Sequence, residues 1–206
     1  MLAEEHVIMI GGGIGVTPFA SLLLYLRDVL KGQPPVDDRQ AQEIARIAVK
    51  RIRFIWICKT LAYLEWFLEL VRELDSDAST HSWLHMSFFL TNTPKPANLP
   101  ALPQGIAVHS SDGSGFGTLQ RAADGKSNLR VYYCRPALES VLTDYSERHL
   151  LGMKSGLYHN RRVGVYFCGP KPLGDTIQQG CDTVNRANRP KPHDERVKLS
   201  FEQEVF

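Results

Sequence analysis

Short apolar runs alternate along this chain with longer segments whose apolar residues recur at helical spacing. The runs are residues 5–10, 52–58, 83–91, 130–134, 163–168 and 197–201, with a further short strand expected at 106–109. Near-continuous apolar runs of this length are typical of parallel strands that are buried on both faces. Helices are expected to begin near residues 18, 61, 136 and 170. This alternation predicts an α/β fold with a doubly wound parallel sheet of about five strands and flanking helices.

Two polar segments interrupt the alternation. Residues 31–50 begin with a Gly-Gln-Pro-Pro-Val break and continue with mixed charges, which predicts an inserted surface helix over 38–50. Residues 92–128 are rich in proline, glycine and serine, and we expect a long loop region there. The chain of 206 residues is long enough for one domain with a sizeable core, so residues 1–206 are expected to form a single domain.

Composition narrows the possible partners. The apolar fraction of 43% and the charged fraction of 22% are ordinary for a globular protein, and a net charge of +2 does not favour nucleic acid as a partner. No run approaches the roughly 20 apolar residues of a membrane span, and the first residues lack the features of a signal peptide. We therefore expect the chain by itself to be soluble. Its four cysteines show neither a CxxC pair nor a metal-binding spacing, so we expect a reducing compartment and no metal site.

A glycine run directly after the first apolar run is the main candidate for chemistry. It reads Gly11, Gly12, Gly13, Ile14, Gly15, Val16, Thr17, Pro18, Phe19. We interpret it as a strand, a glycine loop and a new helix, with Thr17 as the cap and Pro18 at the first helical position. Glycines allow close approach of a pyrophosphate, and a helix N-terminus favours its charge. The spacing is not the GxGxxG of dinucleotide-binding dehydrogenases, and an ordinary strand-to-helix turn would also explain the run.

The whole segment GGGIGVTPFASLL resembles the start of the NADPH-binding lobe of the NADPH oxidase (NOX and DUOX) family, within the ferredoxin-NADP reductase superfamily. Four further segments resemble that family in the same order. They are IleTrpIleCysLysThr at 55–60 leading into LeuGluTrpPhe at 64–67, CysArgPro at 134–136, TyrPheCysGlyPro at 166–170, and GluValPhe at 204–206. The resemblance implies a ferredoxin-NADP reductase-like nucleotide-binding domain and an NADPH cofactor.

Cations are expected where the nucleotide's 2′-phosphate would lie. Cys58, Lys59 and Thr60 end the second strand, at a place where an NAD-binding protein would carry an acid. By resemblance, Arg135, followed by Pro136, is the family's phosphate-binding arginine, and Arg121 is a weaker third candidate. The alternative for each cation is an ordinary solvated side chain. The sequence departs from the family in having Lys59 for arginine and Cys134 for glycine, which predicts a milder preference for NADPH over NADH.

The resemblance also implies residues near the reacting groups. Cys168, Gly169 and Pro170 match a family motif whose cysteine lies against the nicotinamide ring, and we expect Cys168 to position that ring. The alternative is a buried structural thiol. Glu204 and Phe206 match the family's terminal segment, in which the last aromatic ring covers the flavin and must yield to the nicotinamide. Cys168, Glu204 and Phe206 are therefore the expected catalytic positions.

These expectations combine into one function. We expect the NADPH-binding part of a transmembrane oxidase, in which a hydride passes from NADPH to FAD and electrons pass through haems to oxygen, giving superoxide or hydrogen peroxide. The flavin-binding lobe and the haem-bearing transmembrane domain are expected outside this chain, with this domain on the cytosolic side. The isolated chain should bind NADPH without turnover. Alternatives are the nucleotide lobe of a ferric-chelate reductase, and a docking module for cytosolic activators through residues 31–50 or 92–128.

Overall fold

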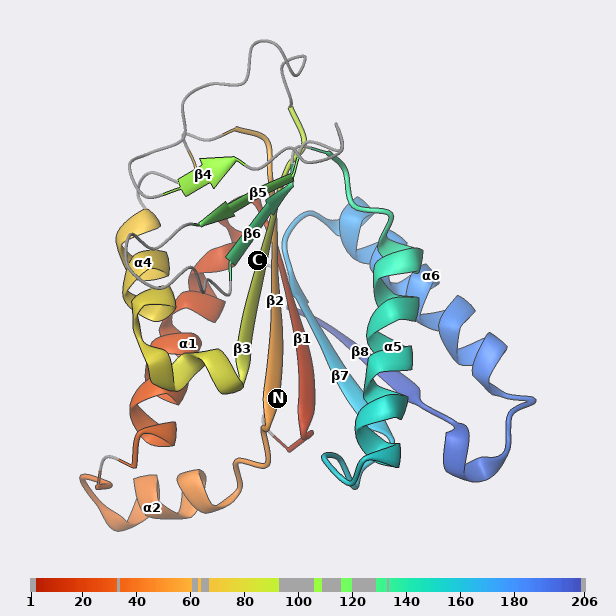
Figure 1. Cartoon of the computed structure of the whole chain (residues 1–206), viewed down its shortest axis with the longest axis horizontal. Coiled ribbons are helices and arrows are strands. Elements are labelled where there is room, and N and C mark those ends of the chain that lie inside the picture. Colours follow the sequence, from red (N-terminus) through yellow and green to blue (C-terminus); the bar gives the residue numbers. More distant parts are fainter. Residues whose placement is uncertain are drawn as a thin grey trace.

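The computed structural model shows a single sheet between two layers of helices (Figure 1). It describes residues 3–32, 34–60, 63, 67–92, 106–108, 116–119, 129–132 and 134–204. The strands are β1 (His6–Gly12), β2 (Arg51–Cys58), β3 (Leu84–Leu90), β4 (Ile106–Val108), β5 (Phe116–Leu119), β6 (Leu129–Tyr132), β7 (Arg162–Cys168) and β8 (Lys198–Glu204). The helices are α1 (Thr17–Leu30), α2 (Asp38–Ala45), α4 (Leu68–Ser76), α5 (Leu138–Lys154) and α6 (Lys171–Asn188).

The strand order is β4-β5-β6-β3-β2-β1-β7-β8. All pairs from β6 to β8 are parallel, which confirms the predicted doubly wound α/β fold with six parallel strands in place of about five. β4 and β5 continue the sheet in antiparallel pairs. β4 matches the short strand expected at 106–109, whereas β5 falls where only a loop was expected. The chain order reverses between β1 and β7, and such a switch point opens a crevice at the carboxyl ends of the strands.

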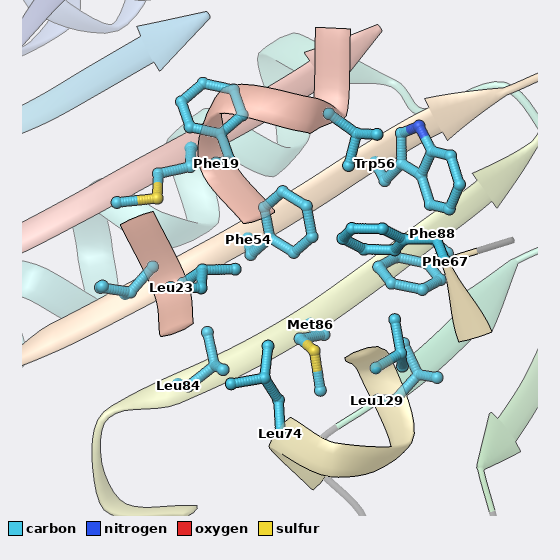
Figure 2. Close-up of a cluster of buried hydrophobic side chains, with 14 of the residues drawn as sticks. Phe19, Leu23, Phe54, Trp56, Phe67, Leu74, Leu84, Met86, Phe88 and Leu129 are labelled. Carbon is cyan, nitrogen blue, oxygen red and sulfur yellow. The ribbon is translucent and has the colours of Figure 1, made fainter. Parts of the chain in front are cut away.

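The core lies on both faces of the sheet because side chains alternate along each strand. Phe54 and Trp56 of β2 pack on the α1 and α4 side with Phe88 of β3, at ring-centroid distances of 6.0 and 5.3 Å from Phe88 (Figure 2). Ile55 and Ile57 point to the opposite side, where α5 and α6 cover the sheet. Burial of each such side chain stabilises the fold by about 1.5–3 kcal/mol.

The starts of two helices differ from the prediction. Thr17 is the first residue of α1 and not its cap, because a short 3₁₀ turn (Gly13–Val16) precedes it. The Thr17 hydroxyl donates to the Ile14 carbonyl at 3.0 Å, so it acts within the turn and does not cap the N–H groups of α1. α5 begins at Leu138 and not at Pro136, since Ala137 still has non-helical backbone angles.

The segment expected as an inserted surface helix carries α2. This helix has no buried residue, and the Asp37 side chain caps it by accepting a hydrogen bond from the Gln40 N–H at 2.7 Å. The helix ends at Ala45, five residues before the expected end at 50. Most of the expected loop region 92–128 lies outside the described residues.

Within the described residues, one segment, Gly13–Leu30, is long and apolar enough to cross a membrane by length and composition alone, although none was expected from the sequence. Its position in the fold gives its apolar side another use. Phe19 and Leu23 are buried against the sheet (Figure 2), and Leu26 is buried in the same cluster, whereas Leu30 at the end of α1 is 40% exposed. The apolar stripe of α1 therefore forms part of the core.

Candidate functional site

A cleft of about 1340 Å³ lies at the carboxyl edge of the sheet, where β1 and β7 diverge. The turn after β1, the end of β2, the segment before α5 and the turn from β7 into α6 contribute to its wall. The lining residues are Gly12, Gly13, Ile14, Gly15, Thr17, Pro18, Ser21, Ile57, Cys58, Lys59, Tyr63, Thr91, Arg135, Pro136, Leu138, Cys168, Gly169, Pro170, Pro172, Leu173 and Thr176.

The cleft brings together most of the residues that the sequence analysis singled out. Segments around positions 13, 59, 135 and 168 are far apart in the chain but meet at this one edge. Gly11, Val16, Phe19 and Thr60 are not among the lining residues; the first three are buried behind the wall. Arg121 and Phe206 lie outside the described residues, and for Glu204 only the strand backbone is described.

A hydrogen bond from a core residue anchors the glycine loop. Trp56, which is fully buried, donates its indole N–H to the Gly13 carbonyl at 2.9 Å. Gly13 has a φ of +57°, a left-handed conformation that favours glycine. Ile14 follows at the tip of the loop and is 77% exposed, so it adds an apolar surface to the cleft. The loop therefore has a fixed backbone and an exposed tip.

Gly15 and Cys168 are in direct contact. A Cβ at Gly15 would lie 2.9 Å from the Cys168 sulfur and closer still to the Cys168 carbonyl, so only glycine fits without displacement. Cys168 borders the cleft, yet its exposed fraction is 0% because the loop covers it. The absence of a side chain at Gly15 thus allows the Gly13–Val16 turn to pack against the end of β7. For Cys168 to touch a bound ring, the Gly13–Val16 turn would have to shift.

The two candidate cations reach the cleft from different elements. Lys59 follows β2, and Arg135 lies between β6 and α5; both are exposed. Backbone hydrogen bonds tie the segment after β2 to the segment after β3, from Thr91 N–H to the Cys58 carbonyl and from Asn92 N–H to the Lys59 carbonyl, each at 2.9 Å. These hydrogen bonds anchor the backbone from which the Lys59 side chain extends. Burial raises the pKa of the neighbouring Cys58 to about 12, so its thiol remains neutral near pH 7.

Several lining residues were missed by the sequence analysis. Thr91 follows β3 and could have been found by examining every strand end at this edge. Ser21 lies one helical turn after Thr17, which places both hydroxyls on the cleft side of α1. Tyr63 and Thr176 gave no signal, because loop and helix residues reach the cleft only through tertiary folding.

The arrangement fits an anionic dinucleotide. The N-terminal ends of α1 and α6 both meet the cleft, where backbone N–H groups and helix dipoles favour phosphate. Lys59 and Arg135 add positive charge, and the volume exceeds the roughly 300–1,000 Å³ of a typical ligand pocket. Among the residues in view, no group of three or more His, Cys, Asp or Glu could hold a metal ion. Fold and site together are those of a dinucleotide-binding α/β domain.

Comparison with known proteins identifies the family. The model of the ferric reductase NAD binding domain matches residues 4–182, so the chain belongs to that family. A superoxide-generating NADPH oxidase heavy chain of Dictyostelium discoideum is 26% identical over 89% of this chain and 22% of its own length. The dual oxidase of Drosophila melanogaster is 27% identical over 90% of this chain and 11% of its own length. These matches confirm the resemblance to NADPH oxidases, although the chain spans less than a quarter of either relative.

A solved structure of a ferredoxin NADP+ reductase from Neisseria gonorrhoeae, with bound FAD and NADP, also aligns with this chain. The TM-score is 0.44 at 13% sequence identity, over 97% of this chain and 56% of that one.

Proposed function

We propose that this chain is the NADPH-binding part of a transmembrane NADPH oxidase, placed on the cytosolic side, that forms superoxide or hydrogen peroxide from oxygen. The observation that carries the proposal is the convergence of the glycine loop, Lys59, Arg135 and Cys168 on one cleft. Family membership and the oxidase relatives support the same function. FAD and haem would be held mainly by parts of the oxidase beyond this chain.

Within the cleft, each group has a distinct role toward NADPH. Backbone N–H groups of the Gly13–Val16 turn and the start of α1 would hold the pyrophosphate. Lys59 as a point charge and Arg135 as a planar fork would hold the 2′-phosphate, and Arg121 remains a weaker third candidate. Gly169 and Pro170, at the turn into α6, would border the nicotinamide end.

The chemistry itself is a hydride transfer, which the nicotinamide supplies and a flavin accepts. The role of this chain is to orient the donor and keep water away from it. Cys168 is a small, buried side chain at the end of β7, and no base lies beside it in the sequence, so its proposed role is to position the ring. Since the turn at Gly15 covers Cys168, binding of the nicotinamide would be accompanied by a shift of that turn.

Parallel calorimetric titrations with NADPH and NADH at low salt test the proposal. We expect tighter binding of NADPH, and Arg135→Ala should weaken NADPH binding about ten- to a hundredfold more than NADH binding, because a charge-assisted hydrogen bond contributes about 1.5–3 kcal/mol. Arg39→Ala, on exposed α2, is the matched control and should change neither affinity. Equal losses for both nucleotides in Arg135→Ala would show that Arg135 does not read the 2′-phosphate.

A second test addresses Cys168. In a form of the protein extended to include the flavin lobe, Cys168→Ala should slow flavin reduction by NADPH in stopped-flow measurements, while NADPH affinity changes little. Cys181→Ala is the control, because Cys181 is similarly buried but lies within α6 away from the cleft lining. A Cys168→Ala protein that reduces flavin at the original rate would remove the positioning role.

A ferric-chelate reductase is the second candidate, and the description of the matching family supports it. The two candidates share the nucleotide cleft and differ in the final electron acceptor. An assay of the complete membrane protein with oxygen and with a ferric chelate as competing acceptors separates them, since an oxidase consumes NADPH in step with oxygen when no iron is added.

A further inference from the structure

A group of cations lies on the α5 side of the sheet, at the end of the strands opposite the cleft. Arg51 and Arg53 belong to β2, and both point to the face opposite Ile52 and Phe54 because side chains alternate along a strand. The parallel register places Arg53 beside His85 of β3. These three side chains therefore share one surface, five or more residues before the end of β2 that borders the cleft.

These cations are partly buried and lack matching acids. The Nε atoms of Arg51 and Arg53 are buried and have no hydrogen-bond partner, and no carboxylate among the described residues pairs with either guanidinium. Arg53 instead lies over the ring of Tyr145 of α5, 5.5 Å from its centroid. Other arginines of the chain do have acids; Arg148, for example, lies 2.7 Å from Asp144.

Burial and neighbouring positive charges both act on these side chains. Burial, together with repulsion by Arg51 and Arg148, lowers the pKa of Arg53 despite the favourable Tyr145 ring. Burial and then Arg53, Arg51, Arg130 and Arg148 lower the pKa of His85 to about 4. Partly desolvated charges without partners cost free energy that a bound anion offsets. Arg148 pairs with Asp144, whereas Arg51 and Arg53 together carry two positive charges that no carboxylate among the described residues pairs, which matches the charge of a dianion.

We propose that Arg51, Arg53 and His85 form a phosphate-binding site that is separate from the nucleotide cleft. Two guanidinium forks can each donate paired hydrogen bonds to phosphate oxygens, and the imidazole can donate a further one. A phosphate monoester carries close to two negative charges at neutral pH, whereas a single carboxylate carries one. The shared chemistry is a phosphate dianion, either on a soluble molecule or as the terminal phosphate of a lipid headgroup.

Titration of the chain with inorganic phosphate, followed by NMR of the His85 ring, tests this site. A nearby dianion favours the protonated imidazole, so phosphate should shift the His85 signals and raise its titration midpoint.

Arg53→Gln and Arg51→Gln should each weaken the phosphate affinity about tenfold or more, since each removes a charge-assisted contact. Two variants guard against misfolding of one, and the far-ultraviolet circular dichroism of both should match the parent chain. Arg39→Gln, an exposed arginine on α2, should leave the affinity unchanged.

Two further arms complete the experiment. Arg135→Ala should leave the phosphate response of His85 intact, which separates this site from the nucleotide cleft. Vesicles of phosphatidylcholine with phosphatidic acid replace inorganic phosphate in the second arm. A response to inorganic phosphate alone identifies a soluble phosphate, and a response to both supports the same site with a headgroup as a further source. No response of His85 in either arm, or a response that Arg51→Gln and Arg53→Gln leave unchanged, overturns the proposal.

Discussion

Among single residues, Trp56 makes the contact that joins the core to the glycine loop. Its ring packs edge-on against Phe88 and Phe67 within the core, while its N–H reaches the Gly13 carbonyl at 2.9 Å (Figure 2 shows the rings). A typical hydrogen bond contributes about 0.5–1.5 kcal/mol to stability, so this one favours a single conformation of the loop. The cleft wall at Gly13 is therefore set partly by a residue that does not line the cleft.

Trp56→Phe should lower the free energy of unfolding by about 1–3 kcal/mol and weaken NADPH binding several-fold, because both ring packing and the hydrogen bond to the loop are diminished. Urea unfolding and calorimetric titration measure the two effects. Trp83→Phe is the matched control: Trp83 is buried in the same cluster but precedes β3 at the opposite edge of the sheet, so we expect lower stability with unchanged affinity. If both variants bound NADPH like the parent, the loop would not depend on Trp56.

Between elements, a network of polar groups joins the start of β1 to α5 and the segment after it. Glu5 accepts hydrogen bonds from the N–H groups of His159 and Asn160 at 2.6 and 2.8 Å. His149 Nε2 donates to the Asn160 carbonyl at 2.8 Å, and the Nδ1 atoms of His149 and His6 lie 3.3 Å apart, so one of them donates to the other. Burial lowers the pKa of both imidazoles, which favours their neutral forms.

Acid should lower the free energy of unfolding at pH values above those at which the carboxylates become protonated. Burial lowers the pKa of His6 and His149 below the ordinary 6.5, and that of His85 to about 4. The unfolded chain therefore binds more protons than the folded one below about pH 6.5, and the free energy of unfolding should fall as the pH drops from 6.5 towards 4. Urea unfolding at several pH values between 5 and 7.5 measures this slope.

His85→Gln should make the slope of stability against pH shallower, whereas His193→Gln, at an exposed position, should not change it. Glu5 contributes in a lower range: burial opposes ionisation, but hydrogen bonds from Lys50 and the backbone lower its pKa to about 2. Its stabilisation is therefore present above its ordinary pKa of 4.5 and is lost only as the pH falls towards 2. A stability that stayed constant between pH 7.5 and 5 would contradict the proposed neutral histidine pair.

For the whole molecule, the proposed oxidase function requires more than the nucleotide cleft. The chain covers 11–22% of the Drosophila and Dictyostelium relatives, and a flavin is required to accept the hydride. We therefore expect the chain alone to bind NADPH but to show no NADPH oxidation until a flavin lobe is added. All side chains of α2 are at least partly exposed. Docking of activator proteins on the segment 31–50 therefore stays a prediction.

Deletion of Phe206 tests whether the terminal ring controls the access of the nicotinamide to the flavin. In a form extended to include the flavin lobe, deletion of Phe206 should strengthen nicotinamide binding, because an aromatic ring that covers the flavin competes with the nicotinamide for the same face. Titration of the oxidised flavin with NADP+ measures the affinity, and Phe206→Tyr, which keeps a ring, serves as the control. Equal affinities with and without Phe206 would exclude gating.

The sequence by itself determined the local features of this protein. Apolar periodicity and the positions of glycine and proline are local signals, so a parallel sheet, its flanking helices and the glycine loop were predictable. The sheet has six parallel strands where about five were expected. The strand end at Lys59 and the turn at Gly169 were predictable for a related reason, because ligand-binding residues collect at the carboxyl ends of parallel strands.

Tertiary structure alone decided which distant residues meet. The contact of Gly15 with Cys168 and the hydrogen bond from Trp56 to Gly13 join residues far apart in the chain. Arg53 and His85 are likewise distant in the chain and adjacent in the sheet. The net charge of +2 gives no indication that the Arg53 guanidinium lacks a pairing carboxylate. Such contacts depend on strand order and register, which close packing of the two core faces fixes only when the whole sheet has formed.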